Sequence, residues 1–333
     1  MTSTSASRAE VAGRVAHGPE RVVAVVVAYN RRDLLAETLD ALAAQTRLPD
    51  AVVVVDNAST DGSADLARAH DVGADVVRLE RNTGGAGGFA TGLARALTEF
   101  AGDLVWLMDD DTIPTPTALA ELLGAREDYP GRPALLASRA VWHDGREHPM
   151  NTPRERPFVS ADLRDRARLA GAVQVRTASF VSLLLDAGAV RREGLPMAAY
   201  FIWNDDFEYT ARLLRRRVGL YVPGSVVEHR TKTFGATDVD PGERFYFEVR
   251  NKLWMYAYSS AFGPAGTVLY GGSSVRRWVR TALRSTERGV LARAAWRGLR
   301  DALASPPAAT TEVLAGLPVS GAVAQVEAGA GRG

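Results

Sequence analysis

Apolar residues in the first part of the chain follow two different periods. Residues 22–29 (VVAVVVAY) form an unbroken and mostly β-branched run, which is typical of a strand buried on both faces of a parallel sheet. Leu35, Leu39 and Leu42 then recur at helical spacing, so they predict a helix with one buried face. Asn30, directly before this pattern, is expected to cap the helix N-terminus.

Three further apolar runs predict strands at residues 51–55, 75–79 and 104–108, with helical patterns between them. Strands that alternate with helices pair in parallel through right-handed crossovers, so the sequence predicts an α/β fold with a doubly wound, mostly parallel sheet. Ligands of such sheets bind at the carboxyl ends of the strands. Polar clusters follow the four strands and are expected to meet at this rim: Tyr29-Asn30, Asp56-Asn57, Asn82-Thr83-Gly84 and Asp109-Asp110-Asp111.

Both ends of the chain are expected to be tails. Residues 1–20 lack the apolar segment of a secretory signal, so we expect a flexible segment there. Residues 305–333 are rich in Ala, Gly and Pro without an apolar period, which predicts a low-complexity tail. An α/β domain over residues 21–235 and a helical extension over residues 236–304 are expected between them.

Composition narrows the function classes. Hydrophobic residues at 46% and charged residues at 24% are typical of a folded globular protein. The absence of cysteine excludes disulfides, thiolate nucleophiles, zinc fingers and iron–sulfur clusters. Forty basic and 39 acidic residues leave a net charge of +1, which is too small for nucleic-acid binding through a general positive field.

Three consecutive aspartates end the strand expected at residues 104–108. Such a cluster repels itself unless a cation neutralises it. Asp109 and Asp111 share one side of an extended chain, so they can bind one ion while Asp110 points elsewhere. Ligands that are all oxygen suit Mg²⁺ or Mn²⁺. The alternative is a solvated turn with helix-capping aspartates, but capping needs one such residue and not three.

Residues 82–88 form a glycine-rich stretch that opens a predicted helix. Gly85, Gly87 and Ala90 match the G-x-G-x-x-A spelling of a dinucleotide fingerprint, which would suit a nicotinamide-dependent oxidoreductase. However, the match follows the third strand and not the first, and it leaves the aspartates unexplained. Glycine lets the backbone approach a ligand and a helix N-terminus favours negative charge, while a mobile loop is the alternative.

Five spaced motifs follow one another along residues 22–230. They are, in chain order, VVVAYNRRDLLAETLDALAAQT, VVVVDNASTDGS, NTGGAGGFATGL, LMDDDTIPTPTAL and FIWNDDFEYTARL. Together they resemble the family-2 glycosyltransferases of GT-A fold. Within that family, the glycine-rich and aspartate motifs are most similar to galactofuranosyltransferases of actinobacteria, which extend a lipid-linked glycan with UDP-galactofuranose. Rhamnosyltransferases that use dTDP-rhamnose share much of the pattern.

This resemblance implies a GT-A catalytic domain over residues 21–235 and a role for each rim segment. Asp109 and Asp111 would hold the ion on the donor diphosphate, with Asp110 beside the nucleotide. The nucleotide base would lie in a pocket formed by Ala28, Tyr29, Asn30 and Asp56, and the nucleotide and sugar would lie against Asn82, Thr83, Gly84 and Gly85.

A second acidic pair follows Trp203. By resemblance, Asp206 corresponds to the general base of the family. In the family, Glu usually precedes this base, whereas Asp205 precedes it here, so either aspartate can hold that role. Trp203 would offer an apolar face to the acceptor sugar. Alternatively, the two acids only stabilise a helix N-terminus.

His229 ends another β-branched run and aligns with a histidine that completes the metal site of related enzymes. Glu228 and Arg230 flank it and are expected to orient it. A structural histidine at a strand end is the alternative. Arg250 belongs to an aromatic helix that, by resemblance, forms a wall of the acceptor site, although packing against the catalytic domain would explain it equally well.

The C-terminal part contains features of a membrane surface binder. Residues 253–275 carry no charge, but internal Ser, Gly and Pro residues argue against one spanning helix, so we expect a packed or interfacial segment. Residues 276–300 contain eight arginines and one acid, a local charge of +7. Some of these arginines recur every four residues and form a stripe near Trp278 and Trp296, which suits binding to an anionic lipid surface. The alternative is an ordinary solvated helix. The stripe consists of Arg276, Arg280, Arg284 and Arg288.

The functional hypothesis is a metal-dependent inverting glycosyltransferase. It would move galactofuranose, or alternatively rhamnose, from a nucleotide sugar to a glycan acceptor that a polyprenyl diphosphate can carry. The expected location is the cytoplasm, with peripheral attachment to the inner face of the plasma membrane, and no nucleic-acid partner is expected. A nucleotidyltransferase lacks support because a glycine-rich basic first loop is absent, and a non-catalytic sugar-nucleotide binder stays open.

Overall fold

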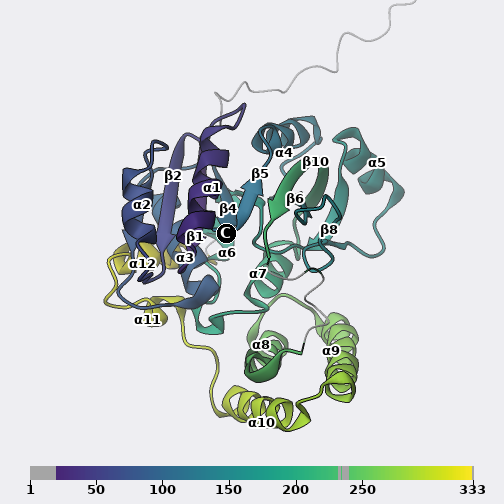
Figure 1. Cartoon of the computed structure of the whole chain (residues 1–333). Coiled ribbons are helices and arrows are strands. Elements are labelled where there is room, and N and C mark those ends of the chain that lie inside the picture. The colour runs from purple at the N-terminus through teal and green to yellow at the C-terminus, as the bar shows by residue number, and fades with distance from the viewer. Residues whose placement is uncertain (1–19, 232–233, 235–239, 332–333) are drawn as a thin grey trace, which may run out of the picture.

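The computed structural model describes residues 20–231, 234 and 240–331. In this part of the chain, a ten-stranded sheet is covered by helices on both faces (Figure 1). The strands are β1 (Val22–Ala28), β2 (Ala51–Asp56), β3 (Asp75–Arg78), β4 (Leu104–Asp109), β5 (Thr112–Pro114), β6 (Leu135–Val141), β7 (Arg154–Glu155), β8 (Val173–Thr177), β9 (Leu183–Asp186) and β10 (Gly219–His229). Their order is β3-β2-β1-β4-β9-β6-β10-β8-β7, and β5 pairs with β10.

The four strands expected from the sequence are confirmed as β1 to β4, each with an end that differs by one residue. β1 pairs in parallel with β2 and β4, and β2 pairs in parallel with β3. By contrast, β8 and β9 run antiparallel to both of their neighbours. The sheet is therefore mixed but mostly parallel, and the chain order reverses beside β1, where doubly wound sheets bind their ligands.

Two apolar cores lie on the two faces of β1. Val23, Val25 and Val27 point into one core, and the intervening Val22, Ala24, Val26 and Ala28 point into the other, so an apolar residue is needed at every position of the strand. The helices of this part are α1 (Arg32–Ala43), α2 (Ser63–Ala69), α3 (Gly84–Thr98), α4 (Ala118–Asp128), α5 (Ala161–Leu169), α6 (Ala187–Glu193) and α7 (Asp205–Leu213), with the 3-10 turn η1 (Ala198–Tyr200).

The buried stripe of Leu35, Leu39 and Leu42 on α1 is confirmed, but the expected cap is wrong. The helix begins at Arg32, its N-cap residue Arg31 forms no capping hydrogen bond, and the N–H of Arg32 donates to Asp61 Oδ2 at 2.9 Å. Asn30 instead adopts a positive φ of 52°, and its Oδ1 accepts a hydrogen bond from the backbone N–H of Thr60 at 2.8 Å. Its side chain therefore joins the loops that follow β1 and β2.

The glycine-rich stretch packs a helix onto the sheet. A Cβ atom at Gly88 would lie 2.5 Å from Val27 Cγ1, and a Cβ atom at Gly92 would lie 2.2 Å from Val25 Cγ1. Both distances are too short for a non-bonded contact. Glycine at these positions therefore lets α3 lie directly on β1. Because the G-x-G-x-x-A match lies inside α3 and not in a strand-to-helix turn, the dinucleotide interpretation loses its structural basis.

Residues 242–304 form the 3-10 turn η3 (Gly242–Arg244) and three helices, α8 (Phe245–Tyr258), α9 (Pro264–Arg284) and α10 (Arg288–Ala304). They gather beyond α7 on one side of the sheet (Figure 1). The uncharged run 253–275 is divided between α8 and α9, as its Ser, Gly and Pro residues indicated. Among the described residues, we find no helix with the length and apolarity needed to span a bilayer.

The expectation of a tail over residues 305–333 is wrong for most of that stretch. Residues 310–313 and 320–329 form the helices α11 (Thr310–Val313) and α12 (Ser320–Gly329), and α12 packs against α3 (Figure 1). Leu314 and Val323 are fully buried in the same core as β1. The high Ala and Gly content obscured an apolar pattern with helical spacing in the sequence.

Residues 1–19 of the other expected tail lie outside the described part of the chain, as does the expected domain boundary between residues 235 and 236. Glu20, the remaining residue of that tail, forms an ion pair with Arg126 at 2.7 Å.

Candidate active site

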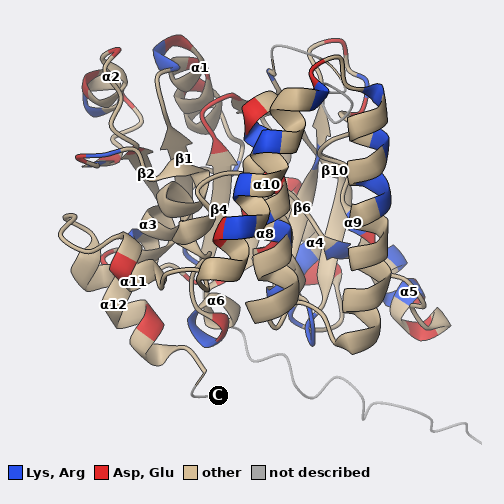
Figure 2. Cartoon of the chain, turned by 90° about the horizontal axis from the view of Figure 1, so that it is seen from below, with Lys and Arg blue, Asp and Glu red and all other residues tan. Residues whose placement is uncertain are grey.

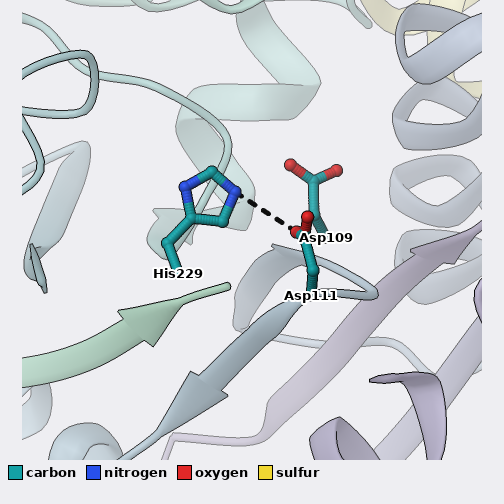
Figure 3. A group of neighbouring side chains, drawn as sticks. All are labelled: Asp109, Asp111 and His229. Carbon is teal, nitrogen blue, oxygen red and sulfur yellow. Dashed lines mark ion pairs between the residues drawn. The ribbon is translucent and has the colours of Figure 1, made fainter. Parts of the chain in front are cut away.

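Two aspartates and a histidine meet where β4, β5 and β10 end. β4 ends at Asp109, a two-residue turn follows, and β5 pairs antiparallel with β10 so that Thr112 lies opposite His229. This pairing brings His229 Nε2 to 3.2 Å from Asp111 Oδ1 (Figure 3). One potential ligand atom from each of Asp109, Asp111 and His229 lies within 4.8 Å of the others. The three residues can therefore share one metal ion.

The geometric reason for this grouping differs from the one expected. Asp110 and Asp111 occupy the turn between β4 and β5, so the period of an extended strand does not apply to them. Asp110 does point elsewhere, as predicted: its carboxylate accepts hydrogen bonds from the backbone N–H of Tyr29 at 2.9 Å and from Arg31 at 3.0 Å. It thereby fixes the loop that follows β1.

Burial and mutual repulsion perturb all three aspartates. Burial, followed by the charges of Asp111 and Asp110, raises the pKa of Asp109 well above its usual range. Burial also raises the pKa of Asp110 to about 6, against the influence of Arg31. Burial acts on Asp111 in the same direction, but hydrogen bonding and charge from His229, together with Arg31, outweigh it and lower its pKa. Three carboxylates face one arginine, Arg31, so the cluster has an excess of negative charge, which favours a bound cation.

The donor atoms fit a divalent cation. Asp111 Oδ1 is buried, and the group nearest to it in the described part of the chain is His229 Nε2 at 3.2 Å, itself a potential ligand atom, so this oxygen retains a lone pair for a shared metal ion. Two carboxylates and one imidazole are ligands that Mg²⁺ and Mn²⁺ accept. Arg31, which the sequence analysis did not single out, supplies a positive charge 2.6 Å from Asp111 Oδ2.

His229 is oriented by a residue from a distant loop. Its Nδ1 lies 2.8 Å from Asn151 Oδ1, which favours the tautomer with a proton on Nδ1 and a free Nε2. The expectation that Glu228 and Arg230 orient it is wrong, because Arg230 pairs with Glu228 and with Glu37. No local sequence signal pointed to Asn151, which lies 78 residues before its partner.

The residues expected to bind the nucleotide base surround the ends of β1 and β2. Ala28 is buried, whereas Tyr29 is 45% exposed at the rim. Asp56 is buried, and its Oδ1 accepts a hydrogen bond from Ser59 N–H at 3.2 Å. Its Oδ2 accepts no hydrogen bond among the described residues, and the Arg78 guanidinium lies 3.5 Å away. An acceptor for a ring N–H is thus present beside an exposed aromatic side chain.

The loop before α3 is built from side-chain to backbone hydrogen bonds. Asn82 Oδ1 accepts from Gly84 N–H at 2.8 Å. Asn57 Oδ1 accepts from both the N–H and the hydroxyl of Thr83, and Asn57 Nδ2 donates to the carbonyl of Gly84. The loops after β2 and β3 therefore form one rigid unit.

This unit touches the segment that carries the second acidic pair. Gly84 has a φ of 70°, and a Cβ atom there would lie 2.0 Å from the carbonyl oxygen of Phe201, so glycine is required. A Cβ atom on Gly85 would lie 3.9 Å from Asp205 Oδ2. The acidic pair also lies near the metal site, since the charge of Asp205 acts on Asp109. The structure therefore brings the predicted donor and acceptor segments together.

Asp205 and Asp206 begin α7 in different environments. Burial, followed by the charge of Asp206, raises the pKa of Asp205 to about 8. Burial also raises the pKa of Asp206, but two groups oppose this rise, the N–H of Phe207 and the ammonium of Lys252. The Phe207 nitrogen lies 2.6 Å from Asp206 Oδ1. At neutral pH, Asp205 is therefore mainly protonated.

The segment before this pair is strained. Phe201, Trp203 and Asn204 all have φ near 65°, a region that residues with a side chain rarely occupy. Asn251 on α8 is fully buried, and its Nδ2 donates to the carbonyls of Tyr200, Ile202 and Trp203 at 2.8 to 3.0 Å. This amide therefore holds the strained segment in place.

Arg250 takes part in the same clamp. Its guanidinium donates to the carbonyls of Ala199 and Tyr200 and lies 4.3 Å from the centre of the Trp254 ring. These contacts favour the packing alternative over direct contact with an acceptor. Trp203 remains 36% exposed beside the acidic pair, so its side chain is accessible.

The sheet topology, with an Asp-Asp-His group at its rim, is that of the GT-A class of glycosyltransferases. Staphylococcus aureus TarS (residues 1–349) in complex with UDP has this fold, with a TM-score of 0.58, 16% identity and coverage of 93% of this chain and 87% of that chain. The mannosyltransferase PcManGT of Pyrobaculum calidifontis, in complex with GDP-Man and Mn²⁺, aligns with a TM-score of 0.51 and 19% identity over 93% of this chain and 80% of that one.

Residues 23–172 match the family described as Glycosyl transferase family 2. Galactofuranosyltransferase GlfT1 of Mycobacterium tuberculosis (strain ATCC 25618 / H37Rv) is 36% identical over 209 residues, which are 59% of this chain and 65% of that protein. The matched region thus spans slightly less than two thirds of this relative. Over residues 23–172, slightly less than half of its length, the chain is therefore similar to family 2 glycosyltransferases, in agreement with the resemblance drawn from the five motifs.

Proposed function

We propose that the protein is a metal-dependent glycosyltransferase that moves a sugar from a nucleotide diphosphate donor to a glycan hydroxyl with inversion. The observation that carries this proposal is the grouping of Asp109, Asp111 and His229 within 4.8 Å at the rim of a family 2 domain. Asp205 and Asp206 lie beside this group, so a site for the leaving diphosphate adjoins a site for proton removal.

The residues divide the reaction between two sites. Asp206 takes the proton of the acceptor hydroxyl, whose oxygen attacks the anomeric carbon from the side opposite the nucleotide. The bond from that carbon to the diphosphate oxygen breaks, and a single displacement of this kind inverts the configuration. Asp109, Asp111 and His229 would hold Mg²⁺ or Mn²⁺, which would supply positive charge to the departing diphosphate.

For the donor, we propose UDP-galactofuranose. The identity to GlfT1 supports this choice, and the free Oδ2 of Asp56 suits the ring N–H of uracil. Thymine presents the same N–H, so dTDP-rhamnose is the second candidate. The alternative of a nicotinamide-dependent oxidoreductase has no site to support it, because its fingerprint lies within α3.

A donor panel tests this assignment. The protein is incubated with UDP-galactofuranose, dTDP-rhamnose and UDP-glucose in the presence of Mn²⁺ or Mg²⁺, and release of the nucleotide diphosphate is followed with and without glycan acceptors. We expect UDP-galactofuranose to turn over fastest. Faster release of dTDP would assign a rhamnosyltransferase, and binding without release of any donor would indicate a sugar-nucleotide binder.

The arginine stripe expected from the sequence is divided in the structure. Arg276, Arg280 and Arg284 belong to α9, whereas Arg288 begins α10 after a turn, so the four residues do not form one stripe. Arg277 is exposed and pairs with Glu248. Figure 2 shows basic residues along both helices.

The exposed face of α9 is nevertheless suited to a membrane surface. Val268, Val275 and Val279 are more than half exposed and recur at helical spacing, and Arg276 and Arg280 are exposed next to them. Apolar residues flanked by arginines are typical of a helix that lies in the interface of an anionic bilayer. We therefore propose that α9 attaches the protein to the inner face of the plasma membrane, near an acceptor carried by a polyprenyl diphosphate.

We expect the protein to sediment with vesicles that contain anionic lipid at low salt and to be released at high salt. Each basic residue near such a surface contributes about 1 kcal/mol, so replacing Arg276 and Arg280 with Gln should weaken partitioning roughly thirtyfold. The matched control replaces Arg68 and Arg192, exposed on other elements, and should bind like wild type. Equal binding to neutral vesicles, or dimerisation through the valine face without vesicle binding, would contradict this proposal.

A further inference from the structure

Lys252 is a buried cation beside the acidic pair. It lies on α8, directly after the clamp residue Asn251, and is 5% exposed. Its Nζ lies 3.8 Å from the centre of the Phe207 ring, and no hydrogen bond or ion pair to Nζ occurs among the described residues. A buried ammonium group without a direct partner is unfavourable, and such groups concentrate at functional sites.

The choice of lysine at this position is unusual for the chain. Of 40 basic residues, only Lys232 and Lys252 are lysine, and the other 38 are arginine. An arginine side chain stays charged under all conditions and needs several acceptors, whereas an ammonium group is compact and can adjust its protonation when buried. Position 252 therefore favours a compact and adjustable charge.

Four charged groups act on Lys252. Arg154 and Arg277 are cationic, and Glu248 and Asp206 are acidic. The oxygens of Glu248 are engaged, since they accept hydrogen bonds from Asn204, Arg277 and Trp278. Glu248 has the larger influence on Lys252. The carboxylate of Asp206 accepts only backbone N–H groups among the described residues, including that of Phe180, so of the two acids Asp206 is the one without a side-chain donor.

The Phe207 ring fixes this arrangement. Phe207 follows Asp206 in α7, its N–H donates to Asp206 Oδ1, and its ring holds the ammonium of Lys252 against one face. The ring also contacts Phe262 and Tyr270, so its orientation is set by packing. One aromatic residue thereby contacts the cation with its ring and the carboxylate of Asp206 with its backbone N–H.

The pKa shifts agree with this geometry. Burial lowers the pKa of Lys252 to about 7, against the influence of Glu248 and Asp206. Burial raises the pKa of both aspartates. At Asp206, Lys252 is among the chief influences that oppose this rise. At Asp205, Lys252 is not among them, and the charge of Asp206 raises the pKa further. Lys252 thus opposes the effect of burial at Asp206, while the charge of Asp206 adds to the effect of burial at Asp205.

We propose that Lys252 is a positioning residue that keeps Asp206, and not Asp205, in the ionised form that accepts the proton of the acceptor. This inference rests on the proposed glycosyltransferase function. It assigns α8 two tasks toward the acidic pair: Asn251 holds the backbone that leads to it, and Lys252 sets the charge of the second acid.

A titration that needs no activity tests the electrostatic part. Protein labelled with ¹³Cε-lysine has two lysine resonances, which the Lys252→Met variant assigns. We expect Lys252 to titrate near pH 7 and Asp206→Asn to lower its pKa by about one unit or more, because an opposite charge is lost. Asp205→Asn should change it less. A pKa of Lys252 that is indifferent to Asp206→Asn would overturn the inference.

The pH dependence of nucleotide release tests the catalytic part. Removing the cation in Lys252→Met raises the pKa of Asp206, so the acidic limb of the profile should move to higher pH by about one unit, with a roughly tenfold loss on that limb and recovery at higher pH. Lys252→Arg keeps the charge and should restore the limb. A merely structural role would lower the rate equally at every pH and would overturn the inference. Wild-type protein without turnover of any donor would overturn the proposed function, and the titration would still decide the role of Lys252.

Discussion

Asp111→Asn is expected to reduce metal-dependent nucleotide release by about a hundredfold to a thousandfold, the loss typical of removing one strong electrostatic contact to a developing charge. Asp111 carries the most stable negative charge of the cluster, since its pKa is lowered, and its Oδ1 is free for a ligand. Asn keeps the size of the side chain but removes the charge. Initial rates of nucleotide release at several Mn²⁺ concentrations measure this effect, and calorimetry should show weaker metal-dependent nucleotide binding.

The melting temperature should stay nearly unchanged in this variant. The substitution loses the ion pairs with Arg31 and His229, but it also relieves repulsion from Asp109 and Asp110. Asp165→Asn on the surface of α5 is the matched control and should keep full activity. Full turnover by wild type in the presence of a chelator would remove the metal assignment.

The parts of the site that follow directly from a strand were predictable. β1, β2 and β4 are buried on both faces, so their apolar runs are nearly uninterrupted, and the polar residues after them must lie at the rim. β3 lies at the edge of the sheet and is only partly buried. Asp109, Asp111 and Asp56 were found in this way. His229 needed the family resemblance, because its place opposite Thr112 depends on antiparallel pairing between β5 and β10.

Residues that act through tertiary contacts were missed or assigned wrongly. Asn151 orients His229 from a loop with no periodic pattern, and its side chain gains that role only when the chain has folded. Arg250 seemed suited to the acceptor site by its motif, but its donors are occupied by backbone carbonyls. Residues 305–333 were misread because helical packing against α3 uses only a few apolar side chains, among them Leu314 and Val323.

The base assignment gives the second large effect. Asp206→Asn should reduce transfer by about 10² to 10⁴-fold, the usual range for loss of a general base, because an amide cannot take up the acceptor proton. Binding of UDP should be unchanged, since Asp206 lies outside the Asp109, Asp111 and His229 group. Transfer to a saturating acceptor and UDP binding by calorimetry measure the two quantities separately.

Asp205→Asn is the internal control for this prediction, and the two acids should respond differently. The pKa of Asp205 is raised to about 8, so at neutral pH its side chain is mainly the neutral acid, which an amide resembles in shape and charge. We therefore expect Asp205→Asn to keep most of its activity near pH 7. The reverse result would be a large loss of activity in Asp205→Asn with normal transfer by Asp206→Asn. It would assign the role of base to Asp205. Asp205 would then have to be the ionised member of the pair despite its deeper burial.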